Sequence, residues 1–432
     1  MTGRRARSLF VLCLVSLGCI LFGLALAARS GCRPSTVVAG LAISFIPYAG
    51  LLAASRSLRS LPPLRLAAVA LLLGAPFVFA PPLLSDDLYR YLWEGRIWLE
   101  GFNPYRLAPD DLALGPLRDE VWPNINNPTI GSIYPPLSQL LFVVAAWVGG
   151  KVWTVKLLAL LAHAITAASV ARIAKSPRAP LALALNPLLL SESALNGHLD
   201  ILCGLALLVT AWALARQRYL RASVAVCAAV GLKVVGLALL PLFARRPKVL
   251  LGATFASVVL LLPLIVSRAP VDPVSGAGQF ASRWRGNESL FGLADWVGRH
   301  GLGDTSADLA ARAMMVLAFL ALCAVAVKRR SPSLPAARVL IWSVLLLSPQ
   351  VHPWYLAWLL PLELVAGGSA GLVWSAAVLC AYAPVDLWVS HGVWRMSPWL
   401  QIFEYSIVAL ALIFDPQRPT LQSQPAEGQF LL

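Results

Sequence analysis

The sequence predicts an all-α membrane protein, a polytopic bundle of roughly 11–13 transmembrane helices. Two observations support this fold class. Of the 432 residues, 59% are apolar and only 13% are charged, so the chain can supply many spanning helices but no large soluble domain. The apolar residues also form separate runs that approach the roughly 20 residues needed to cross a bilayer.

Nine of these runs are long enough to be predicted as spans, near 9–28, 36–54, 64–82, 153–172, 198–215, 248–267, 309–327, 371–389 and 400–414. The first follows three arginines and is too long for the apolar region of a signal peptide, so we expect an uncleaved span. Pro and Gly interrupt five shorter runs, which are predicted as short spans or re-entrant helices that line a cavity. These lie at 137–149, 179–190, 222–243, 335–348 and 353–366.

The net charge is +15, and the basic residues lie in short loops between spans. This distribution is typical of membrane proteins that follow the positive-inside rule and not of nucleic-acid binding. One orientation, with both termini in the cytoplasm, places every basic cluster on the cytoplasmic side. The clusters are Arg56/Arg59/Arg65, Arg172/Lys175/Arg178, Arg216/Arg218/Arg221, Arg245/Arg246/Lys248 and Lys328/Arg329/Arg330. We therefore expect one embedded domain over 1–416, extracytoplasmic loops at 83–136 and 268–305, and a disordered tail at 417–432.

The segment from Ser85 to Tyr105 begins the first outer loop, which holds eight of the chain's 20 acidic residues. Its pattern predicts a helix that lies in the membrane interface, with Leu88, Tyr91, Leu92 and Leu99 on one face and Asp87, Arg90 and Glu94 on another. In a purely structural interpretation, Ser85 caps this helix, and Arg90 pairs with Asp86 and Asp87 at its positive end. In a functional interpretation, the two adjacent carboxylates supply a base for a hydroxyl acceptor.

Further polar groups are expected on the same outer side, in four segments. Tyr134 precedes a Pro-Pro helix start, and Lys233 lies within an apolar run. His198 and Asp200 lie between two apolar runs with Glu192 and Asn196, and Gln350 and His352 precede a helix that begins with the aromatic residues Trp354, Tyr355 and Trp358. Each has a structural alternative, namely a helix start, a solvated turn, a snorkelling lysine or interface anchors. Functionally, Lys233 would bind an anion such as a lipid phosphate, and His352 would carry a proton. In the second loop, Arg283, Trp284, Arg285, Asn287 and Glu288 would cover the cavity mouth.

Three short motifs follow one another along the chain: Gly101-Phe102-Asn103-Pro104-Tyr105, Tyr134-Pro135-Pro136-Leu137, and Gln350 with Trp354, Tyr355, Leu356, Leu359 and Pro361. In order and rough position they resemble G-x-x-P-Y, Y-x-P-L and Q-x-x-x-W-Y-L-x-x-L-P-L of the multi-spanning GT-C glycosyltransferases. The resemblance is to bacterial polyprenol-phosphate-mannose-dependent mannosyltransferases and, more distantly, to the first mannosyltransferase of GPI-anchor assembly. Eukaryotic relatives carry D-x-D where this chain has Ser-Asp-Asp, which leaves the principal aspartate and any metal open.

The resemblance implies an enzyme that moves a hexose, with mannose as the first candidate, from a polyprenyl-phosphate donor to a lipid-linked or glycan acceptor. Transfer would proceed with inversion on the extracytoplasmic face. Asp86 would then be the base, Asp87 would bind the acceptor or help to hold a divalent metal, and Lys233, His352 and Arg90 would stabilise the departing phosphate. The other predicted substrate-binding residues are Glu94, Arg96, Asn103, Tyr105, Tyr134, His198, Asp200, Gln350, Trp354 and Tyr355.

Two alternatives come from other functional classes. A secondary transporter or lipid flippase would also have broken helices and intramembrane charges, but it predicts inverted halves, which the sequence does not display. A protein that only binds lipid-linked intermediates would keep the fold and tolerate the loss of both aspartates. Membrane lipids are expected partners in every case, and nucleic acid in none.

Overall fold

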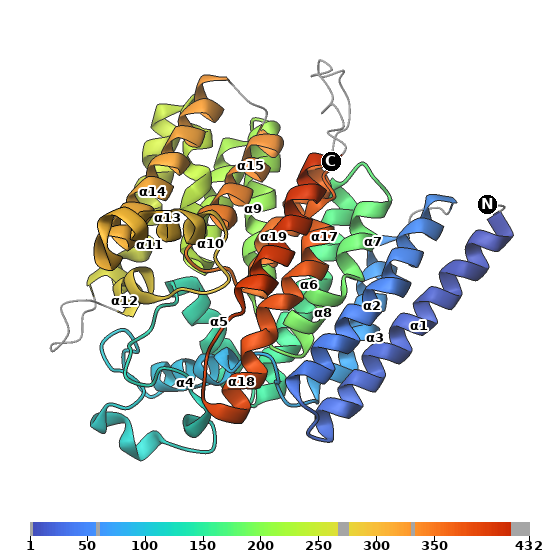
Figure 1. The fold of residues 1–432 in the computed structure, drawn as a ribbon, viewed down its shortest axis with the longest axis horizontal. Coiled ribbons are helices and arrows are strands. Elements are labelled where there is room, and N and C mark those ends of the chain that lie inside the picture. The colour runs from blue at the N-terminus through green and yellow to red at the C-terminus, as the bar shows by residue number, and fades with distance from the viewer. Residues whose placement is uncertain (1–2, 58–60, 267–275, 330–332, 416–432) are drawn as a thin grey trace.

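The computed structural model describes residues 3–57, 61–266, 276–329 and 333–415 (Figure 1). These residues form helices joined by loops, and within them no strand is formed, only an isolated bridge between Gly286 and Gln350. The prediction of an all-α polytopic bundle is confirmed. The tail predicted at 417–432 and the first part of the second outer loop lie outside the described residues.

Among the described residues, six helical segments are long and apolar enough to cross a membrane. They are α1 (Gly3–Arg29), α2 (Pro34–Ala54), α6 (Val152–Ile173), α11 (Pro247–Val266), α14 (Asp304–Lys328) and the continuous series α17 (Ala370–Ala377), η6 (Val378–Tyr382) and α18 (Ala383–His391). Shorter apolar helices complete the bundle: α3 (Pro63–Val78), α5 (Pro136–Trp147), α9 (Asp200–Ala215), α10 (Tyr219–Leu232), η4 (Val234–Phe243), α15 (Ser333–Leu347), η5 (Pro353–Tyr355) with α16 (Leu356–Ala366), and α19 (Pro398–Ile413).

Three runs predicted as full spans form helices of only 16 residues, namely α3, α9 and α19. At 1.5 Å per residue such a helix is about 24 Å long, shorter than the roughly 30 Å of a bilayer core. For α3 the cause is local, because Pro81 and Pro82 follow closely and cannot continue a helix.

Two of the five interrupted runs break into separate helices, one beside a proline and one at a lysine. Run 179–190 divides at Asn186 into α7 (Arg178–Ala184) and α8 (Pro187–Ala194), with the Asn186 side chain accepting a hydrogen bond from the Leu189 amide. Run 222–243 divides at Lys233, whose backbone is extended (φ −151°, ψ 138°) between α10 and η4. These breaks supply irregular backbone inside the bundle, where a site can be built.

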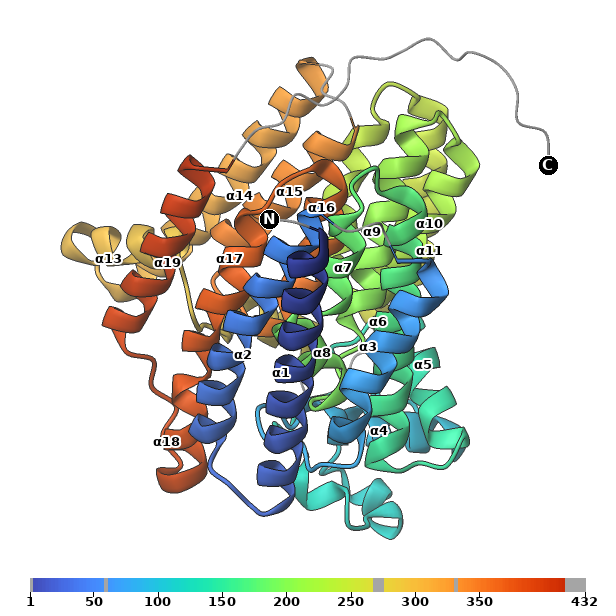
Figure 2. The same cartoon turned by 90° about the vertical axis from the view of Figure 1, so that its right-hand side faces the viewer.

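The long helices run roughly along one axis, and the two ends of the bundle differ (Figure 1). Helix α1 begins and α19 ends at one end, whereas α4 (Asp87–Leu99) and residues 100–135 lie at the other (Figures 1 and 2). The main core forms around α9, which packs against α6, α10, α15 and α16. This arrangement brings the α8–α9 loop, the Lys233 break and the start of α16 towards α4.

Helix α4 is present as predicted, but its charged face is not open to water. Arg90 and Glu94 are 4% and 1% exposed, whereas Leu99, expected on the apolar face, is 49% exposed. A Cβ at Gly95 would lie 2.1 Å from the Phe142 carbonyl oxygen, so α4 packs directly on α5. The helix is therefore held between α5 and the outer loop.

Candidate active site

Two aspartates stand at the start of α4 and share one partner. Asp86 is exposed and Asp87 is half-buried. The Nδ2 atom of Asn126, in the outer loop, donates to Oδ1 of both carboxylates at 2.7 Å. The Asp87 amide donates to Ser85 Oγ at 3.3 Å. Ser85 nevertheless precedes the N-cap position, which Asp86 occupies without a side-chain capping bond, so the prediction that Ser85 caps the helix is corrected.

The surroundings of Asp87 favour its neutral form. Burial, followed by the charge of Asp86, raises the pKa of Asp87 to about 6, against the opposing effects of Asn126 and Lys233. Asp200 also raises this pKa, so two charged groups from distant segments, Lys233 and Asp200, act on the carboxyl together with the adjacent Asp86. A carboxylate with a pKa close to the working pH is suited to general base catalysis.

Arg90 does not pair with the aspartates, which corrects the structural interpretation of this segment. Its Nε donates to Glu94 Oε1 at 2.8 Å, and its other nitrogens donate to backbone carbonyls of residues 126, 127 and 130. Glu94 Oε2 in turn accepts from Ser132 Oγ at 2.8 Å and Gln139 Nε2 at 2.5 Å. The buried pair thus fixes the loop that carries the bridging asparagine, and substrate binding by Arg90 and Glu94 stays a prediction.

Three other predicted binding residues shape the outer loop. Arg96 forms an ion pair with Asp119 at 2.6 Å. The Asn103 side chain accepts from the Tyr105 amide at 2.9 Å, and the Tyr105 hydroxyl donates to the Tyr134 carbonyl oxygen at 2.8 Å. These contacts bring the second motif, at Tyr134, against the first.

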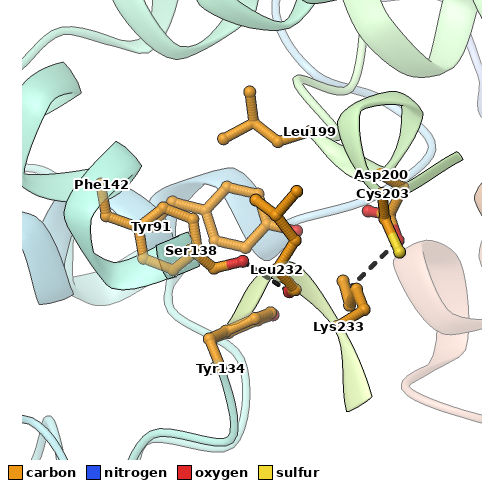
Figure 3. Close-up of a pocket in the computed structure, with 9 residues that line it drawn as sticks. All are labelled: Tyr91, Tyr134, Ser138, Phe142, Leu199, Asp200, Cys203, Leu232 and Lys233. Atoms are coloured by element: carbon orange, nitrogen blue, oxygen red, sulfur yellow. Dashed lines mark hydrogen bonds and ion pairs between the residues drawn. The ribbon is translucent and has the colours of Figure 1, made fainter. Parts of the chain in front are cut away.

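Lys233 lies at the meeting point of the predicted segments, where its ammonium group has protein partners. Its Nζ is 3.3 Å from Asp200 Oδ1 and 5.3 Å from the centroid of the Tyr134 ring. Trp358 Nε1 donates to the same Asp200 oxygen at 2.8 Å, and Asp200 is 3% exposed. Figure 3 shows Lys233 and Asp200 beside a pocket whose opposite side carries the rings of Tyr91, Tyr134 and Phe142.

A column of three stacked rings links the early and late motifs. His198 stacks on Trp354 with centroids 4.0 Å apart, and Trp354 stacks on His352 at 4.1 Å. Tyr355 meets His352 edge-on at 5.3 Å, and Gln350 Nε2 contacts His352 Nε2. The predicted aromatic anchors therefore order the two histidines instead of facing lipid.

Both histidines are held neutral. Burial, with the positive charge of Lys233, lowers the pKa of His352 to about 3, and the same causes lower the pKa of His198 well below its usual value. Neutral imidazoles can donate one hydrogen bond each without adding charge. Lys233 therefore supplies the positive charge of this cluster.

Three contributors were not predicted as site residues from the sequence. Asn126 bridges the aspartates from an irregular loop with no periodic pattern, and only the amide content of that loop pointed to it. Trp358 orients Asp200, and the Tyr91 hydroxyl lies 3.3 Å from His198 Nδ1. Both belong to segments that the sequence had singled out, but their aromatic side chains were interpreted as structural.

The two aspartates are the predicted candidates for holding a divalent metal. Within the described ranges, no group of three or more His, Cys, Asp or Glu side chains is arranged for a metal ion. Asp86 and Asp87 instead accept from an amide N–H₂, whose hydrogens oppose a cation at that position. The donor set fits a hydrogen-bonded acid pair better than the six oxygens that Mg²⁺ requires.

Comparison with known proteins gives two matches. A family model described as alpha-(1->6)-mannopyranosyltransferase, N-terminal domain, matches residues 35–246. Alpha-(1->6)-mannopyranosyltransferase A of Corynebacterium glutamicum is 29% identical over 187 residues, which cover 38% of this chain and 35% of that protein. The match thus spans about a third of the relative's length, and no solved structure matches. Both matches confirm the resemblance to GT-C mannosyltransferases that the motifs predicted.

Proposed function

We propose that this membrane protein, which is similar to the GT-C mannosyltransferases, transfers a hexose from a polyprenyl-phosphate donor to a hydroxyl of a lipid-linked or glycan acceptor. Mannose is the proposed sugar, because the matched relative is named as a mannopyranosyltransferase. One observation carries the proposal: Lys233 lines a pocket with aromatic rings, and its charge lowers the pKa of both Asp87 and His352, which lie far from it in sequence. The pocket offers a cation and aromatic faces, and the proposed base lies close enough for the Lys233 charge to act on it.

Asp87 is the proposed base, in place of Asp86, which the resemblance had favoured. Asp87 takes the proton of the acceptor hydroxyl while that oxygen attacks the anomeric carbon of the sugar. The bond from the anomeric carbon to the phosphate oxygen breaks, and the phosphate leaves on its polyprenol with the electron pair. The half-buried position of Asp87 and its pKa of about 6 support this role, and the exposed Asp86 is assigned to the acceptor.

Lys233 is the proposed partner of the leaving phosphate. Its Nζ already faces Asp200 at 3.3 Å, which orients it without burying the charge alone. The neutral side chains of His352 and Gln350 add hydrogen-bond donors to the same anion. The donor and acceptor would enter from the end of the bundle that carries α4, which we assign to the extracytoplasmic face.

The test is transfer from radiolabelled polyprenyl-phosphate-mannose to a panel of lipid-linked acceptors, in membranes from expressing cells. Wild type is compared with Asp87→Asn, Asp86→Asn and, as a matched control at the exposed end of α4, Glu100→Gln. We expect Asp87→Asn to lose at least about 100-fold in rate and the control to keep wild-type activity. If correctly inserted wild type transfers neither mannose, glucose nor arabinose from such donors, a transporter or flippase becomes the better proposal.

A further inference from the structure

The loop 284–289, between α12 (Gly276–Arg283) and α13 (Leu290–Leu302), is bonded to the late motif through its backbone. The Gly286 amide donates to the Pro349 carbonyl at 3.1 Å, and the Val351 amide donates to the Gly286 carbonyl at 3.0 Å. These two bonds lie on either side of Gln350, whose side chain contacts His352. The position of the segment 350–352 therefore depends on that of Gly286.

Helix α19 holds the residue next to Gly286. Asn287 has a left-handed backbone (φ 50°), a conformation that asparagine tolerates better than most residues. Its Nδ2 donates to Glu404 Oε1 at 3.1 Å, and its carbonyl oxygen accepts from the Tyr405 hydroxyl at 2.6 Å. Trp374 Nε1 also donates to Glu404 Oε1, at 2.8 Å. One turn of α19 thus fixes both the side chain and the backbone of Asn287.

The contact between Glu404 and Asn287 leaves two buried acceptor oxygens without a hydrogen-bond partner. Glu404 is 0% exposed, and neither its Oε2 nor Asn287 Oδ1 has a hydrogen-bond partner. No ion pair joins Glu404 to a cation in the part of the chain that the structure describes. A fully buried carboxylate without a cation is costly, whereas a carboxylic acid carries one hydrogen to donate. A proton on Glu404 gives the pair the donor that Asn287 Oδ1 lacks.

We propose that Glu404, as a neutral acid paired with Asn287, is a positioning residue for the donor site. It acts through Asn287 and Gly286 on the segment 350–352 and touches no substrate. This inference rests on the proposed function, which assigns that segment to the donor phosphate. It also gives a role to the second outer loop, which Arg285 ties to α13 through Asp295 and to α14 through Asp308.

The proposal is tested with Glu404→Gln, Glu404→Leu and Asn287→Gly, assayed for the KM of donor and of acceptor separately. Leucine removes the polar pair, and glycine removes the side chain while tolerating the left-handed backbone. For both we expect the donor KM to rise about tenfold, with the acceptor KM within about twofold of wild type. Glu404→Gln should restore the donor KM to within about twofold, because an amide can donate and accept as the neutral acid does.

The matched control is Glu363→Leu, because Glu363 is another fully buried glutamate that accepts from a tryptophan, Trp342 Nε1 at 2.9 Å. It pairs with Arg338 elsewhere in the bundle, so its loss should lower stability without a selective rise in the donor KM. An equal effect of Glu363→Leu and Glu404→Leu on the donor KM would overturn the proposal. So would a Gln variant as impaired as the Leu variant, because the charge would then be required.

A readout that needs no substrate separates this proposal from the proposed function. Amide hydrogen exchange of the peptide that contains Val351 should accelerate in Glu404→Leu and Asn287→Gly and stay at the wild-type rate in Glu404→Gln. If wild type transfers no sugar, the proposed function fails while the exchange result still decides whether the pair positions the segment. Unchanged exchange in Glu404→Leu would refute the positioning role.

Discussion

Replacing Asn126 by alanine should move the pH dependence of the reaction. The side chain donates at 2.7 Å to both aspartates, and such bonds to a charged group are worth about 1.5–3 kcal/mol. When the asparagine is removed, water restores part of the lost hydrogen-bond energy at the exposed Asp86 but less of it at the half-buried Asp87. A net loss of about 1.4 kcal/mol at Asp87 corresponds to a rise of about one pKa unit.

The sign follows from the role of Asp87 as a base. Its pKa of about 6 already lies above the ordinary value, so kcat/KM should fall as the pH drops through about 6. In Asn126→Ala the carboxylate loses a donor that favours its charged form, so the same fall should begin near pH 7. At pH 6.5, kcat/KM of Asn126→Ala should then be about threefold below that of wild type, and at pH 8.5 the two should differ little.

The assay is kcat/KM for the donor from pH 5 to pH 9, with Asn124→Ala as the matched control. Asn124 lies in the same loop, and its side chain donates to the Glu120 carbonyl and not to an aspartate. If Asn126→Ala is active and its acid limb coincides with that of wild type, the bridge does not set the pKa of the base. If Asn124→Ala moves the limb equally, the loop as a whole and not the bridge is responsible.

Three further predictions concern the anion site, the buried ion pair and the topology. Lys233→Met should raise the donor KM about 10- to 100-fold and Lys233→Arg much less; equal donor KM values in wild type and Lys233→Met would exclude the lysine from phosphate binding. Arg90→Leu leaves Glu94 buried without its cation and should cost about 3–5 kcal/mol, so the thermal unfolding midpoint in detergent must fall, and an unchanged midpoint would contradict this. A cysteine at Glu100 should react with an impermeant thiol reagent in intact cells and one at Lys328 only after permeabilisation; the reverse labelling would invert the proposed orientation.

The segments of the site could be predicted from the sequence because polar residues are rare and costly in apolar runs. Lys233 stands out within 222–243, and His352 stands out where an apolar pattern breaks. The pairing of these groups could not be predicted in the same way. Helical spacing lets Arg90 pair either backwards with the aspartates or forwards with Glu94, and only the folded loop decides in favour of Glu94.

The spans show the same limit at the level of the fold. A hydropathy profile identifies apolar runs and their lengths. Six long segments and the interrupted runs correspond to helices as expected. The profile does not show where an apolar run stops being helical, because that depends on single residues such as Pro81. Asn126 is the corresponding case in the site, since irregular loops have no period from which contacts can be inferred.

The charges of the site predict that donor binding is coupled to the protonation of Asp87. Asp87 and Asp200 carry two negative charges near the one positive charge of Lys233, so an incoming phosphate meets a net negative cluster when Asp87 is ionised. The donor should therefore bind more tightly when Asp87 is protonated, and by linkage its binding must raise the pKa of Asp87 further. The acid limb of kcat, which reports the bound enzyme, should lie at higher pH than that of kcat/KM, which reports the free enzyme. Coincident limbs for kcat and kcat/KM would mean that the donor phosphate does not approach Asp87, and the assignment of Lys233 as its partner would fall with it.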